Sequence, residues 1–99
     1  MTTKTIAAPS KPTLKRPPLY KVIIFDDDIT KFQTVMDIAV TYFNKSEDEA
    51  YEVAFRVDNR GEDIAGIYPK DIAETKVALA KKELNLLSFP LRIESFESK

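Results

Sequence analysis

Three consecutive carboxylates, Asp26, Asp27 and Asp28, directly follow the apolar run from Val22 to Phe25. Carboxylates in this arrangement can act as a nucleophile or base, hold a metal ion, bind an ammonium or guanidinium group, or begin a helix. One carboxylate is expected at a helix start, where backbone N–H groups and the dipole stabilise it by about 0.3 to 1 kcal/mol. Three in a row repel one another, so the run favours a site that meets a cation.

The composition excludes several kinds of chemistry. The 99 residues include no Cys and no His, which excludes disulfides, zinc sites of the Cys/His kind, and Cys/His or Ser/His/Asp catalysis. With 15 basic and 16 acidic residues the formal net charge is -1, so nucleic acid and anionic membranes are not expected partners. A protein or peptide partner is favoured. No apolar run approaches the length of a membrane span and there is no signal-peptide core, so we expect a cytoplasmic protein, and we expect no cofactor.

The composition changes near Pro18. Residues 1–18 hold four of the six prolines and no acid, and they carry four positive charges, at Lys4, Lys11, Lys15 and Arg16. This head predicts a flexible N-terminal extension that serves as a tether, a targeting peptide or a solubility extension. Residues 19–99 are enough for one small domain with a modest core.

Hydrophobic periodicity predicts three strands and three helices in that domain. Runs of β-branched and aromatic residues indicate strands, and apolar residues spaced three and four apart indicate helices. In chain order the expected elements are a central strand at 20–25, helices at 31–44 and 46–60, a strand at 64–68, a helix from 69, and a strand at 91–95. The order β-α-α-β-α-β predicts an α+β fold, a single small domain in which a three-stranded antiparallel sheet packs against three helices.

The helix starts carry local signals. Segments 30–33 and 46–49 have the spacing of a capping box, with Thr or Ser first and Gln or Glu three residues later. Pro69 suits the first turn of the third helix, where its missing N–H is no loss, and Asp71 meets the positive end of the dipole.

An enzyme is the weaker interpretation of the acidic run. Asp26, Asp28 and Thr30 after an apolar strand resemble the first motif of haloacid dehalogenase-type phosphatases, in which the first Asp attacks phosphorus. Those enzymes need a parallel sheet that brings a distant Lys and further acids to the same strand ends, and receiver domains need a second, central phosphoacceptor strand. One domain of this size has no room for those layers, so we do not expect an enzyme.

Three segments of the chain resemble the ClpS family. They are PPLYKVIIFDDDIT, the segment GIYPKDIAETKVA at 66–78, and the closing FPLRIE. The resemblance implies an adaptor that carries N-end-rule substrates to the ClpAP protease. Its expected partners are the N-domain of a ClpA-type AAA+ unfoldase and N-degron substrate proteins, and the expected state is a monomer.

The resemblance also implies which residues bind. A free N-terminus is an ammonium with three N–H donors, so its pocket needs about three acceptors beside an apolar cavity. The positions that match the family's ammonium site are Asp26, Asp27, Asp28 and Asp58. Those that match its hydrophobic pocket are Thr30, Phe32, Val35, Ala54, Val57 and Leu91. Those that match its unfoldase-docking face are Asp71, Glu74 and Lys76.

Four departures from the family pattern leave two interpretations open. Asp26 replaces an Asn, Asp58 replaces a His, and Phe32 and Ala54 stand where Met is usual. The first interpretation is a working adaptor with a more acidic pocket. The second is a divergent regulator that docks on the unfoldase without recognising N-degrons, or that holds a cation in its acidic pocket.

Overall fold

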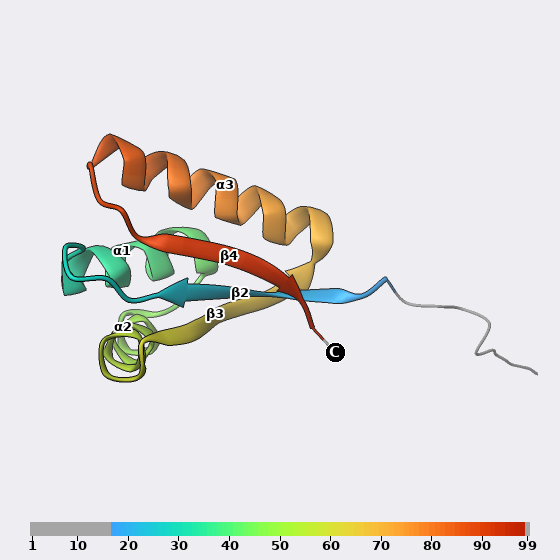
Figure 1. Cartoon of the computed structure of the whole chain (residues 1–99). Helices are drawn as coiled ribbons and strands as arrows, with labels where there is room; N and C mark the ends of the chain where they lie inside the picture. The colour runs from blue at the N-terminus through green and yellow to red at the C-terminus, as the bar shows by residue number, and fades with distance from the viewer. Residues whose placement is uncertain (1–16, 99) are drawn as a thin grey trace, which may run out of the picture.

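The computed structural model describes residues 17–98, so most of the predicted head and residue 99 lie outside the described part of the chain. The elements run in the order β2 (Leu19–Phe25), α1 (Phe32–Phe43), α2 (Glu47–Arg60), β3 (Glu62–Pro69), α3 (Lys70–Leu86) and β4 (Arg92–Glu97). Three helices and a three-stranded antiparallel sheet confirm the predicted α+β fold (Figure 1).

Strand β2 is the centre of the sheet, as its apolar sequence predicts. It pairs antiparallel with β3 on one side and β4 on the other. Its last residue, Phe25, lies opposite Glu62 of β3 and Arg92 of β4. The three strands are therefore in register at the end where the chain leaves the sheet for Asp26.

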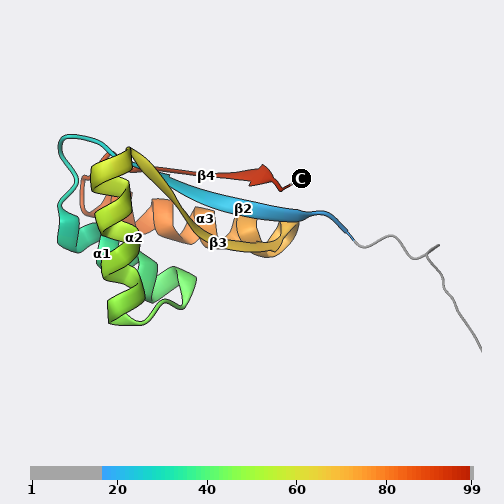
Figure 2. The ribbon, with the colours of Figure 1, turned by 90° about the horizontal axis from the view of Figure 1, so that it is seen from below.

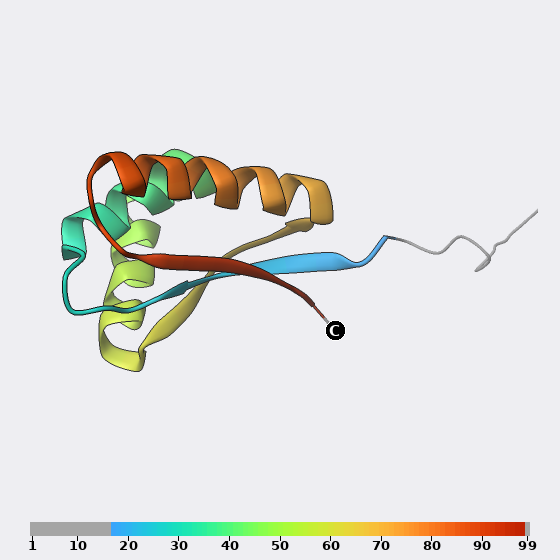
Figure 3. The ribbon, with the colours of Figure 1, turned by 45° about the horizontal axis from the view of Figure 1, so that its top comes forward.

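The core lies between the sheet and the helices. Helices α1 and α3 lie over one face of the sheet, and α2 packs beside them against β3 (Figures 2 and 3). The largest fully buried side chains come from both layers and are Phe43, Ile24, Ile38, Leu84, Ile93, Val22 and Val57. None of the helices in residues 17–98 has the length and hydrophobicity needed to span a membrane.

Helix α2 has the boundaries that its sequence predicts. The Ser46 side chain accepts the Glu49 amide, and the Glu49 side chain accepts the Ser46 amide, which confirms the second capping box. The hydrogen bonds from the backbone and side chain of Ser46 lower the pKa of Glu49. The helix ends at Gly61, whose φ of 92° lies in the left-handed region that glycine tolerates.

The first capping box is a wrong prediction. Lys31 is the N-cap of α1 and makes no side-chain cap bond, and the helix begins at Phe32. The Thr30 hydroxyl instead donates to Oδ2 of Asp27 at 2.8 Å. A charged carboxylate is a stronger acceptor than a neutral partner, so Thr30 turns back toward Asp27 rather than forward to the helix.

Helix α3 begins one residue later than the position of its proline suggests. Pro69 is the last residue of β3 and the N-cap of the helix, and Lys70 is the first helical residue. Asp71 lies in the first turn, as predicted.

Candidate functional site

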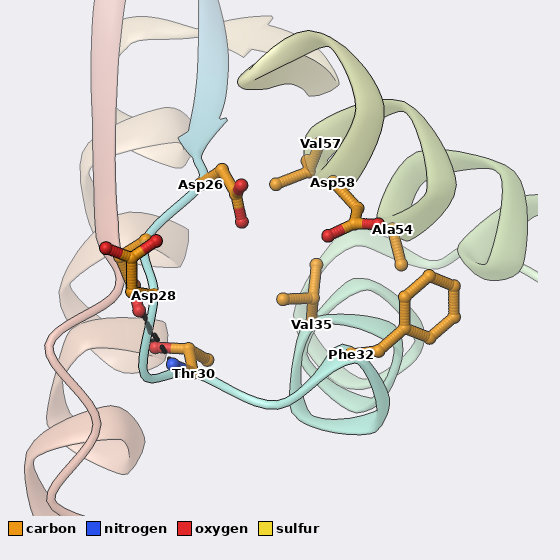
Figure 4. A pocket seen from close by; sticks show the side chains of 9 residues that line it. Asp26, Asp28, Thr30, Phe32, Val35, Ala54, Val57 and Asp58 are labelled. Carbon is orange, nitrogen blue, oxygen red and sulfur yellow. Dashed lines mark hydrogen bonds between the residues drawn. The ribbon is translucent and has the colours of Figure 1, made fainter.

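A cavity of about 300 Å³ opens where β2 ends, between the loop that follows the strand and helices α1 and α2. Its lining consists of Asp26, Asp27, Asp28, Thr30, Phe32, Val35, Ala54, Val57 and Asp58 (Figure 4). The fold thus brings together all the residues predicted for the ammonium site and all but one of those predicted for the hydrophobic pocket.

The exception is Leu91. Its side chain is 6% exposed, belongs to the hydrophobic core, and borders a separate hollow beside Leu84 of α3. Leu91 directly precedes β4, and on this strand the inward side chains pack under α3. The structure therefore places Leu91 outside the lining of the acidic cavity, and its contact with a ligand stays a prediction.

Asp27 holds the loop between β2 and α1 in shape. Its Oδ1 accepts the amides of Ile29 and Thr30, each at 2.7 Å, and its Oδ2 accepts the Thr30 hydroxyl. Partial burial acts to raise the pKa of Asp27, but these hydrogen bonds together outweigh it and keep the pKa below its ordinary value of 3.8. Asp27 is therefore a charged carboxylate whose lone pairs are largely occupied within the loop.

Asp26 and Asp58 face the cavity from two different elements. Their carboxylates point into the same space, one from the end of β2 and the other from the last turn of α2, while Asp28 lies apart along the loop (Figure 4). The amide of Asp26 donates to the carbonyl of Gly61 at 2.8 Å, which fixes the end of β2 to the end of α2. In residues 17–98, no Lys or Arg forms an ion pair with any of the four Asp residues of the cavity. The carboxylates of Asp26, Asp28 and Asp58 are therefore open to a cationic group from a ligand, whereas that of Asp27 is largely occupied within the loop.

The opposite wall of the cavity is apolar. Val35, Ala54 and Val57 are almost completely buried, so their exposed atoms are those that face the cavity. Phe32 is 38% exposed and lies beside Ala54 at the edge of the space (Figure 4). An acidic side and an apolar side in one small cavity suit a ligand that carries a cation next to a hydrophobic group.

A divalent metal is a poor fit to this cavity. Within the described residues, no group of three or more acidic side chains is placed so that it could hold a metal ion. Hard cations need several oxygen ligands at short range, and here Asp27 is already committed to the loop.

The predicted docking residues lie on α3, away from the cavity. Asp71 and Glu74 are exposed, whereas Lys76 is half-buried. The Lys76 ammonium donates to the carbonyl of Tyr42 at 2.9 Å and lies 5.0 Å from the ring centroid of Tyr68. Lys76 therefore also joins α3 to the end of α1.

The loop after β2, which lines the cavity, and the start of α3 lie at opposite ends of β2 (Figure 1). Phe25, next to the cavity, pairs with Glu62, whereas Leu19 at the other end pairs with Pro69, just before α3. A seven-residue strand spans about 20 Å, so the two surfaces are separated by most of the length of the domain.

Two features of the site were missed from the sequence. One is Gly61, whose carbonyl fixes the strand end, because a backbone contact leaves no side-chain pattern. The other lies beside the cavity and is the exposed aromatic pair Tyr51 and Phe55 on α2, in which Tyr51 packs against Phe32. Their spacing of four residues, off the buried stripe of the helix, is a signal that could have shown them.

A small α+β domain whose pocket combines free carboxylates with an apolar wall has the composition of a binding module. The family model described as ATP-dependent Clp protease adaptor protein ClpS matches residues 15–94. The chain belongs to the ClpS family. Its relatives are named as adapters of Clp protease, so this chain is an adaptor that works with Clp protease and not an enzyme.

Individual relatives agree with this assignment. The chain is 43% identical over 76 residues to the ClpS adapter of Wolinella succinogenes, which covers 77% of this chain and 74% of that protein. It is 36% identical over 92 residues to the ClpS adapter of Nautilia profundicola, covering 93% and 94%. The solved structure of Agrobacterium tumefaciens ClpS2 bound to L-phenylalaninamide matches with a TM-score of 0.80 and 31% identity, and covers 84% of this chain and all of that one.

Proposed function

We propose that this adaptor binds the free N-terminus of proteins whose first residue is bulky and hydrophobic, and delivers them to the ClpA-type AAA+ unfoldase of ClpAP. The observation that carries the proposal is the cavity itself, in which Asp26 and Asp58 face an apolar wall. L-phenylalaninamide, the ligand named for the A. tumefaciens relative, has the same two parts, a free ammonium and a bulky apolar side chain.

The roles of the carboxylates differ in this proposal. Asp26 and Asp58 accept two N–H donors of the ammonium, in charge-assisted bonds that are about twice as strong as neutral ones. A carboxylate offers about four lone-pair positions, and Asp27 has used three of them, so it supplies at most one bond to the ligand and mainly holds the loop. Asp28 adds negative charge at the edge of the cavity.

The first side chain of the substrate occupies the apolar part of the cavity. Val35, Ala54 and Val57 form its floor and Phe32 its mouth. The small side chain of Ala54 leaves depth for a Leu, Phe, Tyr or Trp side chain.

Delivery uses the exposed residues of α3. Asp71 and Glu74 present charge to the unfoldase N-domain, and Lys76 supports the same face. Because this face and the cavity lie at opposite ends of β2, one cytoplasmic monomer can hold a substrate and the unfoldase together (Figure 1).

Fluorescence anisotropy of labelled peptides tests the proposal. The peptides differ only in the first residue (Leu, Phe, Tyr, Trp or Ile), with an N-acetylated Leu peptide as the control for the ammonium. We expect micromolar or tighter binding that disappears on acetylation and that a chelator leaves unchanged. Asp26→Ala should abolish this binding, whereas Asp37→Ala, an exposed acid of α1 outside the cavity, should not affect it.

The second candidate is a regulator that docks on the unfoldase without recognising N-degrons. The replacement of the family's Asn and His by Asp26 and Asp58 favours it, because the empty cavity then carries four carboxylates that repel one another. This candidate predicts capture of the unfoldase N-domain but no peptide binding. Asp58→His distinguishes the two in a second way, since it would create peptide binding in a regulator and only adjust an existing affinity in an adaptor.

A further inference from the structure

Three aromatic side chains form a continuous strip that begins at the cavity and runs along α2. The ring centroids of Phe32 and Tyr51 are 5.4 Å apart, and those of Tyr51 and Phe55 are 6.2 Å apart and nearly parallel. We call these three residues the aromatic strip. Its members are 38%, 52% and 50% exposed, in that order.

The strip is not part of the core. The buried face of α2 consists of Ala50, Val53, Ala54 and Val57, and Tyr51 and Phe55 project from the neighbouring face. Large aromatic side chains that are grouped and half exposed are uncommon on a monomer and mark surfaces that contact another molecule.

The strip ends in a shallow hollow of about 250 Å³ that is lined by Tyr51, Glu52, Phe55 and Arg56. Arg56 forms ion pairs with Asp63 at 3.1 Å and with Glu52 at 3.8 Å. Its charge is therefore already neutralised within the protein. Beside Glu52 and Arg56, the hollow is lined by the aromatic rings of Tyr51 and Phe55, and these suit an apolar side chain.

We propose that residues two to four of the substrate lie along the aromatic strip, so that this adaptor reads more than the first residue. The inference rests on the proposed function, because it needs the first residue in the cavity. Phe32 belongs to both the cavity and the strip, so a peptide that leaves the cavity past Phe32 meets Tyr51 next.

The dimensions fit an extended peptide. Extended chain advances about 3.3 Å per residue, so the two ring-to-ring steps of 5.4 and 6.2 Å correspond to about three residues. With the first side chain beside Phe32, the fourth residue lies near Phe55. A hydrophobic side chain at the third or fourth position then covers the stacked pair Tyr51 and Phe55.

The test compares two labelled peptides with the same first residue, length and net charge. Both begin with Leu; one carries Ser at positions two to four, and the other carries Val, Phe and Leu there. We expect the apolar peptide to bind about five- to tenfold more tightly to the unaltered protein. The double variant Tyr51→Ser/Phe55→Ser should lose this difference while keeping its affinity for the Ser peptide.

The control variant is Ile67→Ser, which removes an equally exposed apolar side chain from β3, away from the strip. It should keep the preference for the apolar peptide. Circular dichroism of each variant shows whether the fold is retained.

Other outcomes would overturn the inference. If the unaltered protein binds the Ser peptide and the apolar peptide equally tightly, and binding is still lost on acetylation, the role of the aromatic strip is refuted while the proposed function stands. If the double variant retains the fold but weakens both peptides equally, Tyr51 and Phe55 support the cavity and do not contact residues two to four. A dimer in light scattering that the double variant dissociates would assign the strip to a second copy. No binding of either peptide would refute the proposed function, and the inference with it.

Discussion

Replacing Asp27 with Ala should destabilise the domain by about 2 kcal/mol. The change removes the acceptor for three hydrogen bonds, from the amides of Ile29 and Thr30 and from the Thr30 hydroxyl. Each such bond contributes about 0.5 to 1.5 kcal/mol net, and the partly exposed position places these bonds in the lower half of that range. For a domain of this size, a loss of this magnitude lowers the melting temperature by roughly 10 °C.

Two matched variants separate the shape of the loop from the charge of the cavity. Asp27→Asn keeps an oxygen where the two amides donate but removes the negative charge, so it should retain most of the stability. Asp28→Ala removes an exposed neighbouring carboxylate for which the structure shows no hydrogen bond, so its stability should stay within about 0.5 kcal/mol of the unaltered protein.

Urea denaturation and thermal circular dichroism measure these changes, and peptide anisotropy on the same samples measures binding. Asp27→Ala should lose both stability and peptide binding, because the loop that carries Asp26 and Asp28 is released. Asp27→Asn should remain folded and bind peptide more weakly. A melting temperature for Asp27→Ala within 2 °C of the unaltered protein would refute the reasoning that Asp27 holds the loop.

Three further predictions concern pH, the core and the docking face. The folded protein lowers the pKa of Asp27 and of Glu49 below their ordinary values of 3.8 and 4.5. Their contribution to stability is therefore complete above those ordinary values and declines as the pH falls through the lower pKa values of the folded state. Urea denaturation midpoints at pH 7, 4 and 3 should show this decline. Ile38→Ala should cost about 2 to 5 kcal/mol in urea denaturation, because it leaves a cavity at a completely buried position of α1. Lys76→Ala should abolish capture of the unfoldase N-domain in a pull-down while peptide binding persists, with a stability loss of about 1 kcal/mol from the lost bond to Tyr42.

Each of these predictions has a control and a contrary result. Glu49→Gln should reduce the loss of stability between pH 7 and pH 3. If the urea midpoints of this variant depend on pH as those of the unaltered protein do, the capping bonds of Glu49 do not depend on its charge. Val40→Ala, at an exposed position on the same helix as Ile38, should lower the stability by less than about 0.5 kcal/mol. A loss as large as that of Ile38→Ala would contradict the argument that Ile38→Ala leaves a void in the core. Lys82→Ala, exposed later on α3, should leave unfoldase capture intact, and its loss there as well would point to net charge and not to position.

The fold was predictable because the sequences of its helices and strands have clear periodicity, and because a domain of about 80 residues is too small for most other arrangements of layers. The stripe of α2 and its capping box each predict the same helix, and the structure agrees with both. Most of the cavity could also be predicted, because Asp26 to Phe32 are adjacent in sequence and the resemblance to the ClpS family names the residues of α2 that meet them.

The errors have local physical causes. Thr30 has two nearby hydrogen-bond options, and the spacing of residues cannot show that the Asp27 carboxylate is the preferred one. Leu91 is predicted from its matched position, which does not show that its side chain lies beside Leu84 and outside the lining of the cavity. The aromatic pair Tyr51 and Phe55 is not predicted, because helical periodicity identifies the buried stripe of α2 and assigns no role to its exposed residues.

The central place of β2 has a consequence for how the domain folds. Every residue that lines the cavity lies between positions 26 and 58, and three of them directly follow β2. The second strand that pairs with β2, however, is β4 at 92–97. Contacts between segments so far apart in sequence must close a long loop, so they form more slowly than the local contacts of helices α1 and α2. A nascent chain that already contains all its cavity residues therefore still lacks β4, the strand that completes the pairing of β2. Under the proposed function, substrate binding therefore begins only when the whole domain has folded.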